Sequence, residues 1–244
     1  MCSSSRVSGA RLEAMTIAQV LDREMYAEAE AARLLRVPQQ TLHYWLEGGE
    51  RRGKLYRPVL RVEPRGTRQV TWAEFVEAAL LREYRRTHSA PMNELRNFID
   101  RLREHYGVPY PLAHHQPYVS GSDRQLVYEA QTDSGLDPEF ALVAFASNQL
   151  LLTPASQSFI DRVGWVDDVA AGWRPAADPE SSVRIEPDVR FGKPAVGGVS
   201  TEVIWEQSEA GEAVEDLAEI FGLSVSDVRW ALSYESSQQA QSAA

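Results

Sequence analysis

Cysteine is nearly absent from this 244-residue sequence, in which Cys2 is the only one. A lone cysteine excludes an internal disulfide framework and a cysteine-based zinc site, and it is typical of a reducing compartment. Long apolar runs are also missing: no stretch approaches the roughly 20 residues that a membrane-spanning helix needs, and residues 1–25 lack the apolar core of a signal peptide. We therefore expect a cytoplasmic protein with no membrane partner, no cofactor and no bound metal.

A net positive charge is missing too, because 25 basic residues face 35 acidic ones and give a formal charge of -10. Such a total argues against a simple nucleic-acid binder. The charge is uneven, however: residues 1–110 hold 18 basic and 14 acidic residues, and residues 111–244 hold 7 and 21. Within 31–68, three acidic residues face nine basic ones, namely Arg33, Arg36, Arg51, Arg52, Lys54, Arg57, Arg61, Arg65 and Arg68. Because binding depends on the local field, the N-terminal part remains a candidate for contact with nucleic acid.

Length and composition predict a globular chain of two or three modules, since 43% of the residues are hydrophobic. We expect a mainly helical α+β fold with an N-terminal winged helix-turn-helix, a small mixed α/β middle region and a C-terminal three-helix, helix-turn-helix-like domain. The predicted segments are a flexible N-terminus (1–24), the winged domain with its C-terminal helices (25–110), the middle region (111–182), the acidic three-helix domain (183–235) and a disordered tail (236–244).

Residues 26–47 have the pattern of two helices joined at Arg36-Val37-Pro38. Proline suits the first turn of the second helix, because its missing N–H costs nothing there. Three apolar side chains of that helix share one face and should point inward: Leu42, Trp45 and Leu46. This leaves three others on the outer side: Thr41, His43 and Tyr44.

The segment that follows has β-favouring pieces around Glu63–Arg68, "EPRGTR", which we predict to be the tip of a hairpin, like a wing. Thr71 and Glu74 then have the spacing of a capping box that opens a helix. A further helix is predicted from near Pro91, with an apolar stripe: Met92, Leu95, Phe98, Ile99, Leu102 and Tyr106. The sequence leaves open whether this stripe is core or a dimer seam.

In the middle region, segments 124–131 and 142–154 have the composition of strands, and 155–163 that of a short helix. A second helix pair is predicted within 200–235.

That second helix pair is acidic. Ala218, Gly222 and Val228 have helix-turn-helix spacing, yet the stretch from Glu212 to Glu235 holds six acidic residues and a single base, Arg229. Such a surface repels the phosphates of a duplex. We therefore expect the second pair to contact protein, and the first pair to contact DNA.

A helix that reads DNA needs polar side chains for base edges and cations for phosphates. The first pair meets this requirement, because glutamines open its second helix and Gln can pair with adenine through two hydrogen bonds. Arginines follow at once and extend onto the predicted wing. The candidate DNA-binding residues are Gln39, Gln40, Thr41, His43, Tyr44, Arg51, Arg52, Lys54, Arg57, Arg65 and Arg68.

The stretch "YAEAEAARLLRVPQQTLHYWLEGG" resembles the N-terminal helix-turn-helix of MerR-like regulators. The matching residues are Ala32-Arg33-Leu34, Val37 and Thr41-Leu42-His43-Tyr44. Two positions depart from that family: Arg36 stands where it has a turn glycine, and His43 stands where it has an arginine. A left-handed backbone at Arg36 would be strained.

The C-terminal part is similar to a small bacterial domain that occurs in antitoxins encoded beside PIN-domain ribonucleases. The similarity rests on Ile185, Pro187-Asp188, Gly192-Lys193-Pro194, "AGEAVEDLAEIFGLS" and Tyr234. With both modules, the chain resembles a large VapB-type antitoxin of a type II toxin–antitoxin pair.

This resemblance implies a repressor that binds its own operator DNA and sequesters a PIN-domain ribonuclease toxin, with no chemistry of its own. We expect a homodimer, because one winged module makes too few base contacts for useful specificity. VapB-like proteins commonly block the ribonuclease with an arginine or a tail segment. The candidate toxin-binding residues are Arg229, Trp230 and Tyr234.

Two other functions remain open. One is a MerR-like, effector-responsive regulator without a toxin, whose middle region would bind a small ligand. The other is a metal-dependent nuclease that uses the acidic residues scattered over 161–188. His114-His115 do not by themselves indicate a metal site, because no third ligand stands at usable spacing. Asp167-Asp168 are a lone acidic pair, which is typical of solvated surface.

Overall fold

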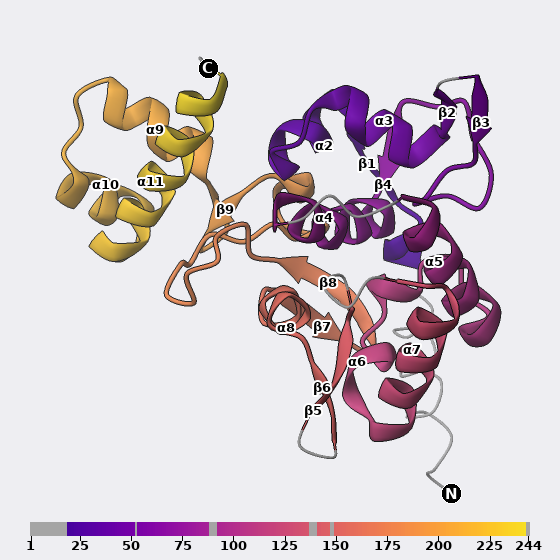
Figure 1. The fold of residues 1–244 in the computed structure, drawn as a ribbon. Coiled ribbons are helices and arrows are strands. Elements are labelled where there is room, and N and C mark those ends of the chain that lie inside the picture. The colour runs from indigo at the N-terminus through magenta and orange to yellow at the C-terminus, as the bar shows by residue number, and fades with distance from the viewer. Residues whose placement is uncertain (1–18, 52, 88–91, 137–140, 147–148, 243–244) are drawn as a thin grey trace, which may run out of the picture. The chain divides into compact units, whose positions relative to one another are not determined.

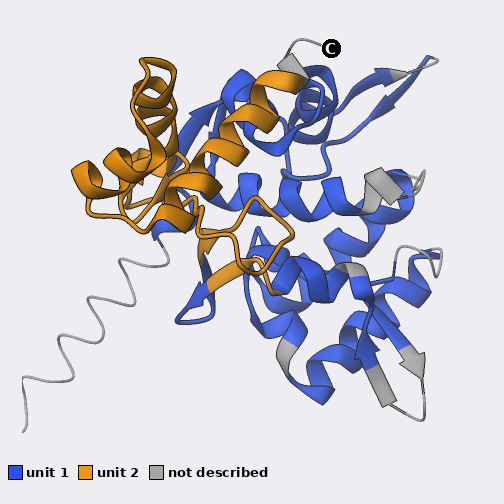
Figure 2. Cartoon of the chain, turned by 90° about the vertical axis from the view of Figure 1, so that its left-hand side faces the viewer, with its two compact units in different colours: residues 1–160, 165–170 blue, residues 161–164, 171–244 orange. Residues whose placement is uncertain are grey.

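The structure, a computed structural model, describes residues 19–51, 53–87, 92–136, 141–146 and 149–242 (Figure 1). The fold is mainly helical α+β, as predicted, and its described strands form small two-stranded sheets. The chain divides into two compact units (Figure 2): unit 1 comprises 1–160 and 165–170, and unit 2 comprises 161–164 and 171–244. This division lies inside the segment 111–182, which the sequence analysis treats as one middle region.

Unit 1 contains both helices and hairpins. Its elements are β1 (Glu24–Ala27), α2 (Glu28–Leu35), α3 (Gln39–Glu47), β2 (Gly49–Arg51), β3 (Lys54–Tyr56), β4 (Gln69–Thr71), α4 (Trp72–Thr87), α5 (Met92–Tyr106), η1 (Pro111–Ala113), α6 (Gln116–Val119), α7 (Gly121–Asp133), β5 (Val143–Ala146), β6 (Gln149–Leu152) and α8 (Pro154–Ile160). Strands β1 and β4 pair antiparallel, and so bring the start of the first helix pair to the start of α4. None of the helices in the described ranges is long and apolar enough to cross a bilayer.

Helix α4 is the central element of unit 1, since it packs against α2, α3, α8 and η1. The predicted capping box is confirmed: the Glu74 N–H donates to Thr71 Oγ1 at 3.3 Å, and the Thr71 N–H donates to Glu74 Oε2 at 2.9 Å. All residues from Trp72 to Arg82 are buried. The Trp72 indole N–H also donates to the carbonyl oxygen of Ala170 at 2.6 Å. The core of this unit is therefore built around a helix whose first turn is fixed by its own side chains.

Helix α5 carries the apolar stripe that the sequence left unassigned between core and dimer seam. Its central members are 0–3% exposed within the single chain: Leu95, Phe98, Ile99 and Leu102. The stripe is therefore core. The helix is followed by Gly107, whose φ of 66° suits glycine.

The segment 124–131, predicted as a strand, is helical, and that prediction was wrong. It lies within α7, where Ser120 caps the helix by accepting a hydrogen bond from the Asp123 N–H at 3.0 Å. This cap outweighs the β-favouring side chains inside the helix. The strands predicted over 142–154 are confirmed as β5 and β6, and the short helix predicted over 155–163 as α8. The turn between β5 and β6 lies outside the described residues.

The chain passes from one unit to the other in the hairpin of β7 (Val163–Val166) and β8 (Val169–Trp173). Its turn residues, Asp167 and Asp168, have φ angles of 45° and 68°. Two successive positive φ angles are typical of a type I′ hairpin turn, in which aspartate is one of the few suitable residues besides glycine and asparagine. The adjacent acidic pair therefore has a structural role at this turn.

In its described residues, unit 2 contains three α-helices and a short hairpin. Its further elements are η3 (Arg190–Gly192), β9 (Ala195–Val196), β10 (Val199–Ser200), α9 (Thr201–Glu209), α10 (Val214–Phe221) and α11 (Val225–Ser242). Its core consists of Val183, Val196, Ile204, Leu217, Ala218, Val228, Ala231 and Tyr234. The expected turn is present, because Gly222 is left-handed at φ 65° and the Asp227 N–H donates to Ser224 Oγ at 3.1 Å.

The tail predicted to be disordered from residue 236 is instead helical as far as Ser242, where the described residues end. Gln238 is only 5% exposed, and its side-chain amide donates to the Tyr234 hydroxyl at 2.8 Å. Alanine and glutamine favour helix, and this contact with the core holds the added turns. The polar composition of the tail therefore does not predict its helical structure.

The buried carboxyl of Glu77 in α4 provides a pH-dependent prediction. Burial, offset by the charge of Arg103 and by the Leu112 N–H that it accepts at 2.9 Å, raises the pKa of Glu77 from 4.5 to about 7. The folded protein thus holds a proton that the unfolded chain has already released. The contribution of Glu77 to stability is full below pH 4.5 and is lost as the pH rises through 7.

We expect the free energy of unfolding of the wild-type protein to fall by roughly 3 kcal/mol, relative to that of Glu77→Gln, between pH 4.5 and pH 8. Glutamine still accepts from Leu112 but does not titrate. Urea denaturation of both proteins across this range measures the difference. If the free energies of unfolding of the two proteins change with pH in parallel, the raised pKa of Glu77 is contradicted.

Candidate nucleic-acid interface

Helix α2 ends in a C-cap at Arg36, which has a left-handed backbone with φ 54° and ψ 47° and connects α2 to α3. Its N–H donates to the Arg33 carbonyl at 3.0 Å, and the Val37 N–H donates to the Ala32 carbonyl at 3.0 Å. These two bonds satisfy the carbonyls at the end of α2. A side chain in this conformation costs about 1–2 kcal/mol, so the predicted strain at Arg36 is present.

The inner face of the pair is as predicted, because Leu42, Trp45 and Leu46 are at most 1% exposed. Gln39 and Gln40 are exposed at the start of α3, and Thr41 is half-buried.

Tyr44, which we expected on the outer face, is buried, and that placement was wrong. Its hydroxyl accepts a hydrogen bond from the Arg96 guanidinium at 3.1 Å, and the guanidinium lies over the tyrosine ring at 5.5 Å. Arg96 belongs to α5, so a second helix covers a side of α3 that helical periodicity alone assigns to solvent. We leave Tyr44 out of the candidate interface.

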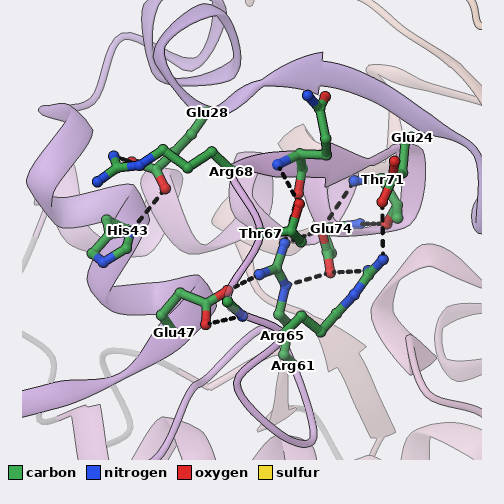
Figure 3. A network of polar contacts seen from close by, with 12 residues as sticks. Glu24, Glu28, His43, Glu47, Arg61, Arg65, Thr67, Arg68, Thr71 and Glu74 are labelled. Carbon is green, nitrogen blue, oxygen red and sulfur yellow. Dashed lines mark hydrogen bonds and ion pairs between the residues drawn. The ribbon is translucent and has the colours of Figure 1, made fainter.

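Glu28 holds three of the predicted DNA-binding side chains, and Figure 3 shows two of them, His43 and Arg68. Its side chain is 1% exposed, and its Oε1 accepts from Gln39 Nε2 at 3.1 Å and from the Arg68 guanidinium at 3.3 Å. Its Oε2 lies 2.8 Å from Nδ1 of His43. One buried carboxylate thus links the start of α2, the start of α3 and the loop before β4. Sequence reasoning missed Glu28, because no local pattern connects it to residues 11–40 positions away.

The predicted position of the wing was wrong. The hairpin is β2–β3, in which Arg51 pairs with Lys54, and "EPRGTR" lies in the loop between β3 and β4. Arg52 lies outside the described residues. Lys54 is exposed, with its ammonium 5.4 Å from the Tyr56 ring centroid. Gly53 has a φ of 73°, so this glycine is the sequence signal that marks the turn of the β2–β3 hairpin.

The loop arginines are bound by glutamates (Figure 3). The Arg61 side chain is 1% exposed, donates to Glu74 Oε1 at 2.7 Å and to the Gln69 carbonyl at 2.7 Å, and is paired with Glu47. Burial lowers the pKa of Arg61, but the hydrogen bond to Glu74 and the charges of Glu74 and Glu47 outweigh burial and raise it. Arg65 bridges Glu74 and Glu24 at 3.1 and 3.2 Å. The basic cluster counted from sequence therefore includes at least one arginine, Arg61, that is unavailable to a ligand.

Two arginines of the segment between β3 and β4 remain largely exposed. Arg68 is 70% exposed and Arg57 is 69% exposed, with Arg57 paired to Asp100 at 3.1 Å. We group these two arginines with the exposed Gln39, Gln40 and Lys54 and call the set the α3 surface; within it, Gln39 and Arg68 contact the same carboxylate, that of Glu28. It combines amide groups on a helix N-terminus with exposed cations, which suits base edges and phosphates.

The predicted toxin-binding residues of unit 2 differ in access. The Arg229 side chain is 69% exposed and lies 4.0 Å from Glu215. Trp230 is half-buried against the core, and Tyr234 is part of the core. Across the described ranges, no group of three or more His, Cys, Asp or Glu side chains is arranged to hold a metal ion.

Comparison with known proteins places the chain in a family. It is 34% identical over 233 residues to the uncharacterized protein Rv2308 of Mycobacterium tuberculosis, covering 90% of this chain and 93% of that protein. The chain belongs to the family of Rv2308. It is also 25% identical over 225 residues to a protein named "Putative antitoxin VapB45" from the same organism, covering 86% of this chain and 93% of that one. No family model matches the chain.

The fold has a counterpart of known structure. The crystal structure of Rv2018 from Mycobacterium tuberculosis superimposes with a TM-score of 0.70 and covers 87% of this chain and 99% of that chain. The sequences are 23% identical, so this comparison establishes a shared fold alone.

Proposed function

We propose that the chain is an antitoxin of a type II toxin–antitoxin pair, which binds a PIN-domain ribonuclease and represses its own transcription by binding operator DNA. It acts by occlusion and has no catalytic residues. The observation that carries the proposal is the relation to VapB45 along nearly the whole chain. The resemblance of the C-terminal segment to antitoxin-associated domains supports the same function.

The α3 surface supports the DNA-binding half of the proposal. A helix pair with an exposed amide-rich N-terminus on its second helix, followed by a hairpin, has the layout of a winged helix-turn-helix. MerR-like reading of DNA would place α3 in the major groove and β2–β3 beside it. The glutamines would then meet bases, and the exposed arginines would meet phosphates.

A growth assay tests the proposal. The ribonuclease encoded beside this gene is expressed from an inducible promoter, with and without the full-length chain. We expect growth arrest that the chain relieves, and co-purification of the two proteins. Arrest that persists at equal expression, or a neighbouring gene that encodes no ribonuclease, would exclude the antitoxin function.

Two substitutions on the α3 surface have different expected effects on operator binding. Arg68→Ala removes a phosphate contact, so it should weaken binding across sequences and reduce the slope of log K against log salt by about 1. Gln40→Ala removes a base contact, so it should relax sequence choice at one position, worth about 1–3 kcal/mol. Mobility-shift titrations on operator and scrambled duplexes at several salt concentrations measure both.

Arg101→Ala is the matched control, because it removes an exposed, ion-paired arginine from α5. It should leave both quantities unchanged. If Arg68→Ala and Gln40→Ala behave like this control, the α3 surface does not bind the operator.

One observation favours a second candidate, an effector-responsive regulator. A surface pocket of about 350 Å³ lies between α5 and α7, with a charged lining that includes Arg101, His105, Glu129 and Asp133. A small polar ligand there could alter a DNA-binding unit without any toxin. This alternative predicts operator binding that changes with a small molecule, and no ribonuclease that co-purifies.

A further inference from the structure

Phe191 is the most exposed large apolar side chain among the described residues, at 89%. It belongs to the short segment between Asp188 and Lys193, which we call the Phe191 loop. Leaving a phenylalanine in water forgoes about 1.5–3 kcal/mol that burial would provide. A side chain of this kind, held out from a folded unit, is suited to insertion into a partner.

The backbone of the Phe191 loop is strained and at the same time held in place. Arg190 and Phe191 have φ angles of 50° and 55°, a left-handed conformation that is a rare outlier for bulky residues. The loop is closed by hydrogen bonds from the Gly192 N–H to the Val189 carbonyl and from the Lys193 N–H to the Arg190 carbonyl, both at 3.1 Å. Strained backbone of this type persists where the surrounding structure fixes it, and it concentrates at functional sites.

The flanks of the loop anchor it to the rest of unit 2. Pro187, Gly192 and Pro194 are buried. The Arg190 side chain donates from Nε to the Gly198 carbonyl at 2.7 Å, which ties the loop to the β9–β10 turn. These contacts fix the backbone on both sides of Phe191, so its side chain is exposed because the loop is held in this conformation.

Charge indicates what kind of molecule the loop would meet. Unit 2 holds fourteen acidic and six basic residues, and three of the basic ones are exposed: Arg190, Lys193 and Arg229. Arg190 and Lys193 flank Phe191, and Lys193 is ion-paired with Glu202 at 3.3 Å. Arg190 is therefore the cation that the loop presents beside Phe191 on this acidic unit. The acidic surroundings disfavour a nucleic-acid backbone, whereas a protein surface with an apolar pocket beside carboxylates complements both features.

We propose that the Phe191 loop is the docking site of unit 2 for a protein partner, with Phe191 filling an apolar pocket and Arg190 facing carboxylates at its rim. The inference rests on the proposed function, which supplies the partner: the ribonuclease encoded beside this gene. The loop is separate in sequence from Arg229, Trp230 and Tyr234. It adds an aromatic anchor that the sequence analysis did not identify.

The test is a binding titration of the purified ribonuclease against the full-length chain, using isothermal calorimetry. Phe191→Ala should weaken binding about thirtyfold or more, as loss of a buried aromatic anchor does. Ile220→Ala removes another apolar side chain exposed on unit 2, at 63%, and should leave binding unchanged. Because Phe191 is 89% exposed, its replacement should leave the core of unit 2 intact, and circular dichroism verifies that the variant folds.

The possible results distinguish failure of the Phe191 docking site from failure of the proposed antitoxin function. Wild-type affinity in Phe191→Ala overturns the docking site alone and leaves the antitoxin function standing. Absence of binding by the wild-type chain overturns both. Loss of self-association in Phe191→Ala, measured by light scattering, with ribonuclease affinity unchanged, would assign the loop to a second copy of the chain and overturn the inference.

Discussion

Arg61→Ala is expected to lower the free energy of unfolding by about 3–5 kcal/mol, the range for removing one partner of a buried ion pair. The Glu74 side chain is 0% exposed, and Arg61 supplies its bonds at 2.7 and 3.1 Å. Without Arg61, a buried carboxylate at the start of α4 loses its main counter-charge. Glu47 and the Gln69 carbonyl lose a donor as well. Urea denaturation followed by tryptophan fluorescence reports this change, because Trp45 and Trp72 are buried in the same unit.

Arg57→Ala is the matched control for charge and side-chain length. Its ion pair with Asp100 is exposed, with side chains 69% and 39% accessible. Pairs of this type contribute about 0–1 kcal/mol. Equal destabilisation by the two substitutions would show that Arg61 does not hold the loop to α3 and α4 as described.

Glu28→Ala is expected to weaken operator binding by roughly 30–100-fold, which corresponds to about 2–3 kcal/mol. Electrostatics alone predicts the opposite sign, because removal of a negative charge near DNA favours association. The geometry predicts a loss, since Gln39, His43 and Arg68 all contact this carboxylate and would lose their fixed positions. A base contact is worth about 1–3 kcal/mol only when its side chain is held in place.

Two further variants isolate this positioning role. Glu30→Ala removes the same charge from the same turn of α2, and should leave affinity unchanged or raise it slightly. Glu28→Gln keeps an acceptor for Gln39 and should recover part of the affinity. Tighter operator binding by Glu28→Ala than by wild type would refute the positioning role of Glu28.

The elements with strong local signals were predictable from sequence. Four features can be predicted from residues that are close together along the chain. They are the junction of α2 and α3 at Arg36, the capping box of Thr71 and Glu74, the apolar stripe on α5 and the cap of α11 at Ser224. Periodicity and capping are local properties, and each is complete within a few residues.

The predictions that were wrong concern side chains whose burial or ion pairing depends on a segment far away along the chain. Tyr44 is buried because Arg96, 52 residues away, covers it. Arg65 was predicted to contact DNA, yet it bridges Glu74 and Glu24, the latter 41 residues away along the chain. A charge count along the sequence cannot detect such pairs, and helical periodicity does not reveal which neighbour covers a face. The α3 surface is consequently smaller than the set of residues predicted for it.

Inhibition of the ribonuclease is the sharpest test of the proposed antitoxin function. The purified ribonuclease encoded beside this gene is assayed with Mg²⁺ on a fluorogenic RNA while the full-length chain is titrated in, and the chain is also assayed alone with Mg²⁺ or Mn²⁺. We expect a stoichiometric loss of cleavage and no cleavage by the chain. Undiminished ribonuclease activity at excess chain, or metal-dependent cleavage by the chain itself, would contradict that function.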